Sequence, residues 1–119
     1  MKNFDRKIWQ EKLTFVAFTA SWCGPCRQME PTLLRFEERM GDRTDVIRID
    51  IDDEQAEPII HRYNVGSVPT LMFFRRGEML WRESGAVGYS HLVTVLEELE
   101  QYELEGQRYW MRQASSSRM

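Results

Sequence analysis

An apolar segment that runs straight into a pair of cysteines constrains this chain more than any other feature. Residues Leu13 to Ala20 are almost all apolar or small, which is typical of a parallel strand buried on both faces. The segment Cys23-Gly24-Pro25-Cys26 follows after two residues, and proline favours the first turn of a helix. We therefore expect a strand–turn–helix unit that places both thiols at the start of the helix.

The position of the two thiols favours redox chemistry. At a helix start, unpaired N–H groups and the positive end of the helix dipole favour the thiolate of Cys23. Cys26 lies one turn further into the helix, so we expect it to be more buried and less reactive. Gly24 and Pro25 form a short, stiff spacer that keeps the two sulfurs within bonding range. These features predict Cys23 as the nucleophile and Cys26 as the resolving thiol of a reversible disulfide.

Other roles for the thiols fit the sequence less well. The chain has two cysteines, which are too few for the disulfide framework of a small secreted domain. They are also too few for a four-ligand zinc site within one chain, because His61 and His91 lie far away in sequence. We interpret both histidines as ordinary surface or helix residues, and we expect no metal and no cofactor. A metal site shared between two chains and a pair of inert buried thiols are the alternatives.

Hydrophobic periodicity predicts the remaining elements. The apolar positions Leu33 and Phe36 continue the cysteine-bearing helix to Met40, with a kink at Pro31. We further expect a first helix over residues 3–11, a strand over 46–51 and a short helix over 52–63. A hairpin of strands 70–75 and 79–83, which turns at Gly77, should follow. Ser90 should cap a last helix, whose inner face consists of Leu92, Val95, Leu96, Leu99 and Tyr102. The order α-β-α-β-α-β-β-α gives an α/β fold with a mixed four-stranded sheet flanked by helices.

Composition and charge exclude several functional classes. The net charge of −3 argues against general nucleic-acid binding, which needs a basic face. No apolar run approaches the ~18 residues that span a membrane. The first eleven residues are charged and contain no apolar stretch, so we expect no secretory signal and a cytoplasmic protein.

Several motifs together resemble the thioredoxin family. They are the segment Phe15 to Cys26 with its WCGPC, Pro31, the alternating segment Val46 to Asp52, the segment Tyr63 to Glu78 with its SVPT, and Gly85. The match covers roughly Leu13 to Leu99. It implies a thioredoxin-like domain over residues 1–106, which leaves residues 107–119 as a basic C-terminal tail.

The resemblance also implies further residues of the site. Pro69 would follow a cis peptide bond and pack against the Cys23–Cys26 pair. The backbone of Val68 would pair with an extended segment of the substrate, by strand addition. Trp22 would flank the site as an apolar contact surface, the alternative being a tryptophan of the core.

The chain departs from the family pattern in two places that bear on its function. The family's buried aspartate, six residues before the first cysteine, is Ala17 here, and the lysine on the next strand is Arg48. The first edge strand of the family has no counterpart. We therefore expect residues 46–51 to form an edge of the sheet, covered by the tail residues Tyr109, Trp110 and Met111 or by a second chain.

The resemblance implies a protein-disulfide reductase that contributes to cell redox homeostasis. Its partners would be disulfide-containing protein substrates and a thioredoxin reductase as electron donor, with neither a nucleic acid nor a membrane involved. We expect a monomer or a weak dimer. The alternative is an interaction module that keeps the fold but turns over slowly, because Ala17 removes the carboxylate that handles protons.

Glu30 is a candidate proton acceptor in place of that aspartate. It lies four residues after Cys26, and residues at this spacing share one face of a helix. Its carboxylate would then approach the Cys26 sulfur directly or through one water. The alternatives are that Glu30 faces solvent, or that it pairs with Arg27 or Arg48.

Overall fold

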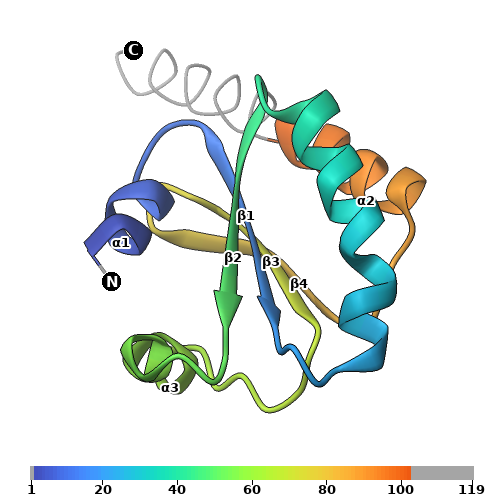
Figure 1. The fold of residues 1–119 in the computed structure, drawn as a ribbon. Helices are drawn as coiled ribbons and strands as arrows, with labels where there is room; N and C mark the ends of the chain where they lie inside the picture. The colour runs from blue at the N-terminus through green and yellow to red at the C-terminus, as the bar shows by residue number, and fades with distance from the viewer. Residues whose placement is uncertain (1, 103–119) are drawn as a thin grey trace, which may run out of the picture. The chain divides into compact units, whose positions relative to one another are not determined.

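The computed structural model describes residues 2–102, and its elements follow the predicted order (Figure 1). They are α1 (Lys2–Ile8), β1 (Leu13–Thr19), α2 (Gly24–Met40), β2 (Thr44–Asp50), the short 3-10 helix η1 (Glu54–Ala56), α3 (Glu57–Arg62), β3 (Thr70–Arg75), β4 (Glu78–Ser84) and a last helix over residues 89–102. The helix predicted over 52–63 is therefore a 3-10 turn followed by α3. Asp53 caps this turn, since its side chain accepts the N–H of Gln55 at 3.0 Å.

The four strands form one mixed sheet in the order β2-β1-β3-β4. β1 runs parallel to β2 and antiparallel to β3, and β3 pairs antiparallel with β4. In the β1–β2 register, Ala17 lies opposite Arg48. Within residues 2–102, β2 is an edge of the sheet, as predicted for residues 46–51.

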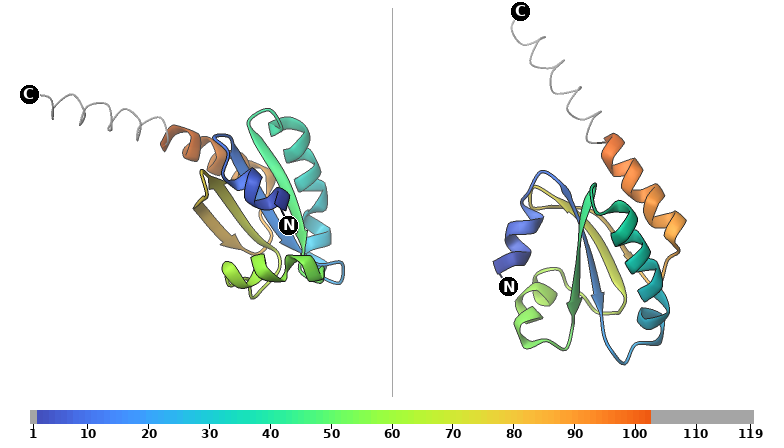
Figure 2. Two further views of the ribbon diagram at one scale, coloured as in Figure 1. Left: turned by 90° about the vertical axis from the view of Figure 1, so that its left-hand side faces the viewer. Right: turned by 45° about the horizontal axis from the view of Figure 1, so that its top comes forward.

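Helices cover both faces of this sheet. Figure 1 shows α1 and α3 on one side and α2 on the other, and the right-hand view of Figure 2 agrees. Phe36 of α2 packs against Phe15 and Phe73, with ring centroids 5.3 and 6.3 Å away. The other face buries Phe4 of α1 and Ile59 of α3 in one cluster with the strands. Because β1 is buried on both faces, it holds the start of α2 firmly at its carboxyl end.

The first helix is shorter than predicted, ending at Ile8 rather than at residue 11. The carbonyl of Ile8 accepts the N–H of Gly77 at 2.8 Å, and that of Gln10 accepts the N–H of Arg76 at 3.1 Å. These carbonyls therefore serve the β3–β4 turn instead of a longer helix. Gly77 has the positive φ expected of it, 79°, and a side chain there would collide with Trp9.

The long helix α2 passes through Pro31 as one element and ends at Gly41. A Cβ atom at Gly41 would lie 2.7 Å from the carbonyl oxygen of Glu37, a distance that side chains do not adopt. This close approach explains why glycine follows the last turn of the helix.

Residues 2–89 form one compact unit, and residues 90–102 belong to a second. In the last helix, Leu92, Val95 and Leu96 are buried, as predicted. The prediction for Tyr102 is wrong, because its side chain is 65% exposed. Leu99, one turn earlier, is only partly buried, although it was also predicted to face inward. The helix begins at Tyr89, so Ser90 lies in its first turn and is not its cap.

No helix within residues 2–102 is long and apolar enough to cross a bilayer. The predicted tail, residues 107–119, lies outside the described residues. The domain boundary at residue 106 and the role of the tail as a cover for the sheet edge therefore stay predictions.

Candidate active site

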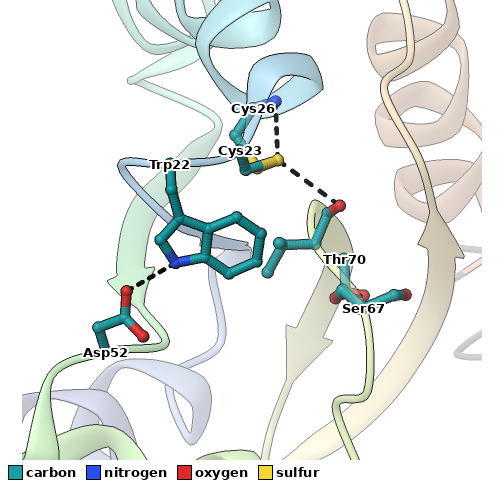
Figure 3. The surroundings of a disulfide bond; sticks show 7 residues. Trp22, Cys23, Cys26, Asp52, Ser67 and Thr70 are labelled. Carbon is teal, nitrogen blue, oxygen red and sulfur yellow. Dashed lines mark hydrogen bonds between the residues drawn. A yellow bond between two sulfur atoms is a disulfide. The ribbon is translucent and has the colours of Figure 1, made fainter.

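The two cysteines form a disulfide at the start of α2, with their Cα atoms 5.3 Å apart. Cys23 is the N-cap residue of the helix and has an extended backbone, with φ −86° and ψ 114°. Its sulfur accepts the N–H of Cys26 at 3.2 Å (Figure 3). Pro25 occupies the first turn, where it lacks an N–H that would otherwise be unpaired. The first turn contains no acidic side chain, so nothing there opposes a negative charge on Cys23.

The predicted difference in burial between the two cysteines is wrong for the disulfide form. Cys23 and Cys26 are each 4% exposed, because both pack with Ala20 and with the partly buried Ile51 and Val68. The two sulfurs differ in their contacts instead. The Cys23 sulfur receives the helix N–H and lies 3.7 Å from the carbonyl oxygen of Val68. Contacts rather than depth therefore distinguish the two thiols.

The loop before β3 brings Val68 to the disulfide. The Val68–Pro69 peptide bond is cis, as the family resemblance implies, and Pro69 is buried. The hydroxyl of Thr70 donates to the carbonyl of Ser67 at 2.7 Å, and the N–H of Gly85 donates to the carbonyl of Pro69 at 2.8 Å. These bonds fix the loop at both ends, so that Val68 is held beside Cys23. The contact of Pro69 with the cysteine pair stays a prediction.

Trp22 lies beside the disulfide and is 63% exposed, which excludes the alternative of a core tryptophan. Its indole N–H donates to the carboxylate of Asp52 at 2.9 Å, so the ring is fixed although it is exposed (Figure 3). An apolar ring held in this way presents a flat surface next to the reactive sulfurs.

Cys26 also lines an open hollow of about 470 Å³. The chain from Thr19 to Ser21 forms one wall, and Cys26, Arg27, Glu30 and Asp50 complete it. Glu30 and Cys26 thus line the same solvent-accessible space. The sequence connects them only through their helical spacing.

Arg48 connects this hollow to the surface of α2. Its Nε donates to Glu30 at 3.0 Å and its Nη1 donates to Glu37 at 3.1 Å. The predicted alternative for Glu30, an ion pair with Arg48, is therefore confirmed. The remaining nitrogen, Nη2, is buried and has no hydrogen-bond partner among the described residues. One guanidinium thus serves two carboxylates and retains one nitrogen that no described residue binds.

The position of the absent aspartate lies next to that guanidinium. Ala17 is fully buried and is the register partner of Arg48. Its methyl group cannot accept a proton or a hydrogen bond. Within residues 2–102, the carboxylates that line the hollow with Cys26 are Glu30 and Asp50.

Three acids of this region were not assigned from the sequence. Asp52 fixes Trp22, Glu37 shares Arg48, and Asp50 lines the hollow. A signal for Asp50 was present, because strand alternation places Asp50 and Arg48 on the same face of residues 46–51. The other two contacts join residues far apart in sequence. The two histidines, His61 and His91, are exposed.

Other parts of the molecule are less suited to this chemistry. A second hollow, about 500 Å³ in volume, lies beside α1 and β2 and is lined by Phe4, Lys7 and Ile47 among others. It contains no cysteine, so we assign the chemistry to the hollow at Cys26. Among residues 2–102, no group of three or more His, Cys, Asp or Glu side chains is placed to hold a metal ion.

Comparison with known proteins extends the sequence resemblance. The model of the thioredoxin family matches residues 1–98. Thioredoxin Y, chloroplastic, of Oryza sativa subsp. japonica is 37% identical over 96 residues, which are 80% of this chain and 56% of that protein. The thioredoxin of Rhodospirillum rubrum is 40% identical over 72 residues, or 60% of this chain and 67% of that protein. The chain thus spans little more than half the length of the rice relative.

A solved structure shows the same arrangement of sheet and helices. A mutant thioredoxin from Halobacterium salinarum NRC-1 matches this chain with a TM-score of 0.73 at 30% identity. The match covers 82% of this chain and 83% of that one. The likeness in sequence is therefore accompanied by a likeness in fold.

Proposed function

Because the chain belongs to the thioredoxin family, we propose that it is a protein-disulfide reductase in which Cys23 attacks and Cys26 resolves. Members of this family are thiol–disulfide oxidoreductases, and the Cys23–Cys26 disulfide is the redox centre of this one. The hydrogen bond from the Cys26 N–H to the Cys23 sulfur is the observation that carries the assignment of roles. A donor aimed at that sulfur stabilises a thiolate at Cys23 once the pair is reduced.

The reaction passes two electrons from the dithiol to the substrate. The Cys23 thiolate attacks one sulfur of the substrate disulfide, the substrate S–S bond breaks, and the released thiolate takes up a proton. A mixed disulfide then joins Cys23 to the substrate. Cys26 loses its proton and attacks the Cys23 sulfur, and the second substrate sulfur leaves and takes up a proton. The products are a substrate dithiol and the Cys23–Cys26 disulfide.

Substrate recognition in this proposal uses the surface around the disulfide. Val68 supports it, because its carbonyl is held 3.7 Å from the Cys23 sulfur by a loop that is fixed at both ends. An extended substrate segment that pairs with the backbone there would place its own disulfide next to Cys23. Trp22 would supply apolar contact on the other flank.

Electron donor, location and assembly belong to the same proposal. A reductase ends each turnover as a disulfide, so it needs a donor, for which we propose a thioredoxin reductase. We propose a cytoplasmic location, where such donors keep thiols reduced, and a monomer or a weak dimer. The rice relative carries the word chloroplastic in its name, so a fractionation experiment is needed for the location.

Reduction of insulin by dithiothreitol tests this function. The parent protein should accelerate the reaction, Cys23→Ser should abolish the acceleration, and Cys26→Ser should accumulate mixed disulfides that are visible on non-reducing gels. In the reduced parent, iodoacetamide should label Cys23 before Cys26. An inactive parent would favour the interaction module, and faster labelling of Cys26 would reverse the roles.

A further inference from the structure

We propose that Glu30 is the proton acceptor for Cys26 and that Arg48 positions the Glu30 carboxylate. Glu37 binds the same guanidinium, so Glu30 can still accept a proton. This inference rests on the proposed function, because it concerns the second step of that reaction.

The second step needs a base near Cys26. Cys26 is 4% exposed, and burial disfavours the charged form of a thiol. The Cys26 N–H donates to the Cys23 sulfur, so this hydrogen bond stabilises the thiolate of Cys23 and not that of Cys26. In an apolar environment, a thiol without a proton acceptor would attack slowly, since the thiolate is the nucleophile. Some group that Cys26 can reach must therefore remove the proton.

The hollow at Cys26 limits the candidates. Its charged or titratable members are Arg27 and Glu30 from α2 and Asp50 from β2. Arg48 reaches in from β2 through its bond to Glu30. β1, which packs against both, contributes Ala17 and no charge at this point. Of these groups, Arg27 and Arg48 cannot accept a proton, which leaves two carboxylates.

The two carboxylates differ in how they are held. Asp50 lies at the end of β2, and its Oδ1 accepts the N–H of Asp52 at 2.9 Å, a local turn interaction. Glu30 lies one helical turn after Cys26 on the same helix, and Arg48 holds its Oε1 at 3.0 Å. Helical spacing thus places Glu30 on the same face of α2 as Cys26, and Arg48 holds its carboxylate at the wall of the hollow. This placement favours Glu30 over Asp50.

Glu37 makes the arrangement suited to proton transfer. If Arg48 bound Glu30 alone, protonation of Glu30 would be strongly unfavourable, because it would leave the guanidinium without a charged partner. Here Glu37 also binds the guanidinium, at 3.1 Å, so the positive charge keeps a partner when Glu30 takes up the proton. The two glutamates are alike in exposure, each side chain being 44% accessible, yet only Glu30 lines the hollow.

Glu30 relays one proton in this step. The Cys26 thiol gives its proton to Glu30, and the resulting thiolate attacks the Cys23 sulfur of the mixed disulfide. The Cys23–substrate bond breaks and the Cys23–Cys26 bond forms. Glu30 then releases the proton through the open hollow to the departing substrate thiolate or to solvent.

The pair Glu30→Gln and Glu37→Gln tests this inference on the full-length protein. Single-turnover release of the second substrate thiol is measured by stopped flow, between about pH 5 and pH 9, with a fluorogenic peptide disulfide. We expect Glu30→Gln to slow this release about tenfold near neutral pH and to move the rising limb of the pH profile upward. Glu37→Gln leaves the Glu30 carboxylate in place but removes the second carboxylate from the same guanidinium, so it should slow release clearly less than Glu30→Gln does.

Two further variants separate the outcomes. Formation of the mixed disulfide is measured in Cys26→Ser with and without Glu30→Gln, and we expect equal rates, because Cys23 does not use Glu30. Failure of Cys26→Ser to form the mixed disulfide would overturn the proposed function itself. Glu30→Asp should recover part of the rate if a carboxylate is what matters. Equal slowing by Glu30→Gln and Glu37→Gln, or slowing by Asp50→Asn while Glu30→Gln is silent, would overturn the proposed role of Glu30.

Discussion

Two ionic clusters lie three residues apart on β2, and their compositions are opposite. At Asp45, one carboxylate receives three donors: Gln10 at 2.7 Å, and Lys7 and Lys12 each at 3.2 Å. At Arg48, one guanidinium serves two carboxylates, Glu30 and Glu37. The first cluster ties α1 and the start of β1 to β2, whereas the second lies at α2 next to the disulfide.

The ratio of cations to carboxylates determines what each cluster can do. The hydrogen bond from Gln10, supported by those from the two lysines, holds the pKa of Asp45 at about 2, against an ordinary value of 3.8. A carboxylate in this state stays ionised in all ordinary conditions and cannot take part in proton transfer. At Arg48 the acceptors outnumber the cation, so one of them can be neutralised without leaving a charge unpaired. A surplus of cations around one carboxylate makes a structural contact, and a surplus of carboxylates around one cation makes a site that can accept a proton.

Adding a carboxylate at Ala17 has the largest expected effect on this comparison. Ala17→Asp would place an acceptor opposite Arg48 in the register, where the buried Nη2 has no partner among the described residues. In the Glu30→Gln background we expect it to restore most of the tenfold loss in resolution, which corresponds to about 1.4 kcal/mol. The measurement is the same single-turnover release of the second substrate thiol.

The control for this experiment is Ala17→Asn, because asparagine has nearly the same shape as aspartate and no negative charge. In the Glu30→Gln background it should not restore the rate of resolution. If Asn rescues as well as Asp, the gain comes from satisfying the guanidinium rather than from moving a proton, and the Arg48 cluster would then resemble the Asp45 cluster in being structural.

Removing the charge of Asp45 should cost stability and leave the chemistry intact. Asp45→Asn should lower the free energy of unfolding near pH 7 by about 1 kcal/mol, since the ion pairs are partly exposed and screened by solvent. Because the pKa of Asp45 is lowered on folding, its contribution is complete above about pH 4 and is lost as pH falls toward about 2. The difference between parent and variant should therefore shrink over that window.

Urea unfolding at several pH values measures this difference. Asp42→Asn is a suitable control, since Asp42 is an exposed carboxylate in the turn just before β2. It should change stability little at any pH. A pH-independent loss in Asp45→Asn would mean that the contact depends on shape and not on charge.

The two clusters also show what could be predicted from the sequence. The element order followed from local periodicity. The strand before the cysteine-bearing helix was predicted because its residues are almost all apolar or small. The proximity of Ala17 and Arg48 followed from the family register, and the β-sheet places them opposite each other. Glu30 was linked to Cys26 by helical spacing, and the hollow adds a shared solvent space.

Predictions failed where tertiary contacts decide the outcome. The end of α1 depends on the N–H of Gly77, a residue far away in sequence. The equal burial of the two cysteines depends on Ile51 and Val68, which reach the pair from other elements. Likewise, the contact of Glu37 with Arg48 joins α2 to β2. Patterns within one helix or strand carry no information on such distant partners.

The smallest expected effect is the change in folding stability when a glutamate of the Arg48 cluster is replaced. It also distinguishes a structural role from a proton-accepting role most directly. Both glutamates are partly exposed, and ion pairs of this kind contribute about 0.5 kcal/mol or less. Glu30→Gln and Glu37→Gln should therefore each lower the free energy of unfolding by less than Asp45→Asn does, and by similar amounts. Equal stability combined with unequal resolution rates would separate the two glutamates by their position relative to the hollow alone. If Glu30→Gln instead destabilises the fold as much as Asp45→Asn, then Glu30 is a structural partner of Arg48, and its slower turnover would need no proton transfer to explain it.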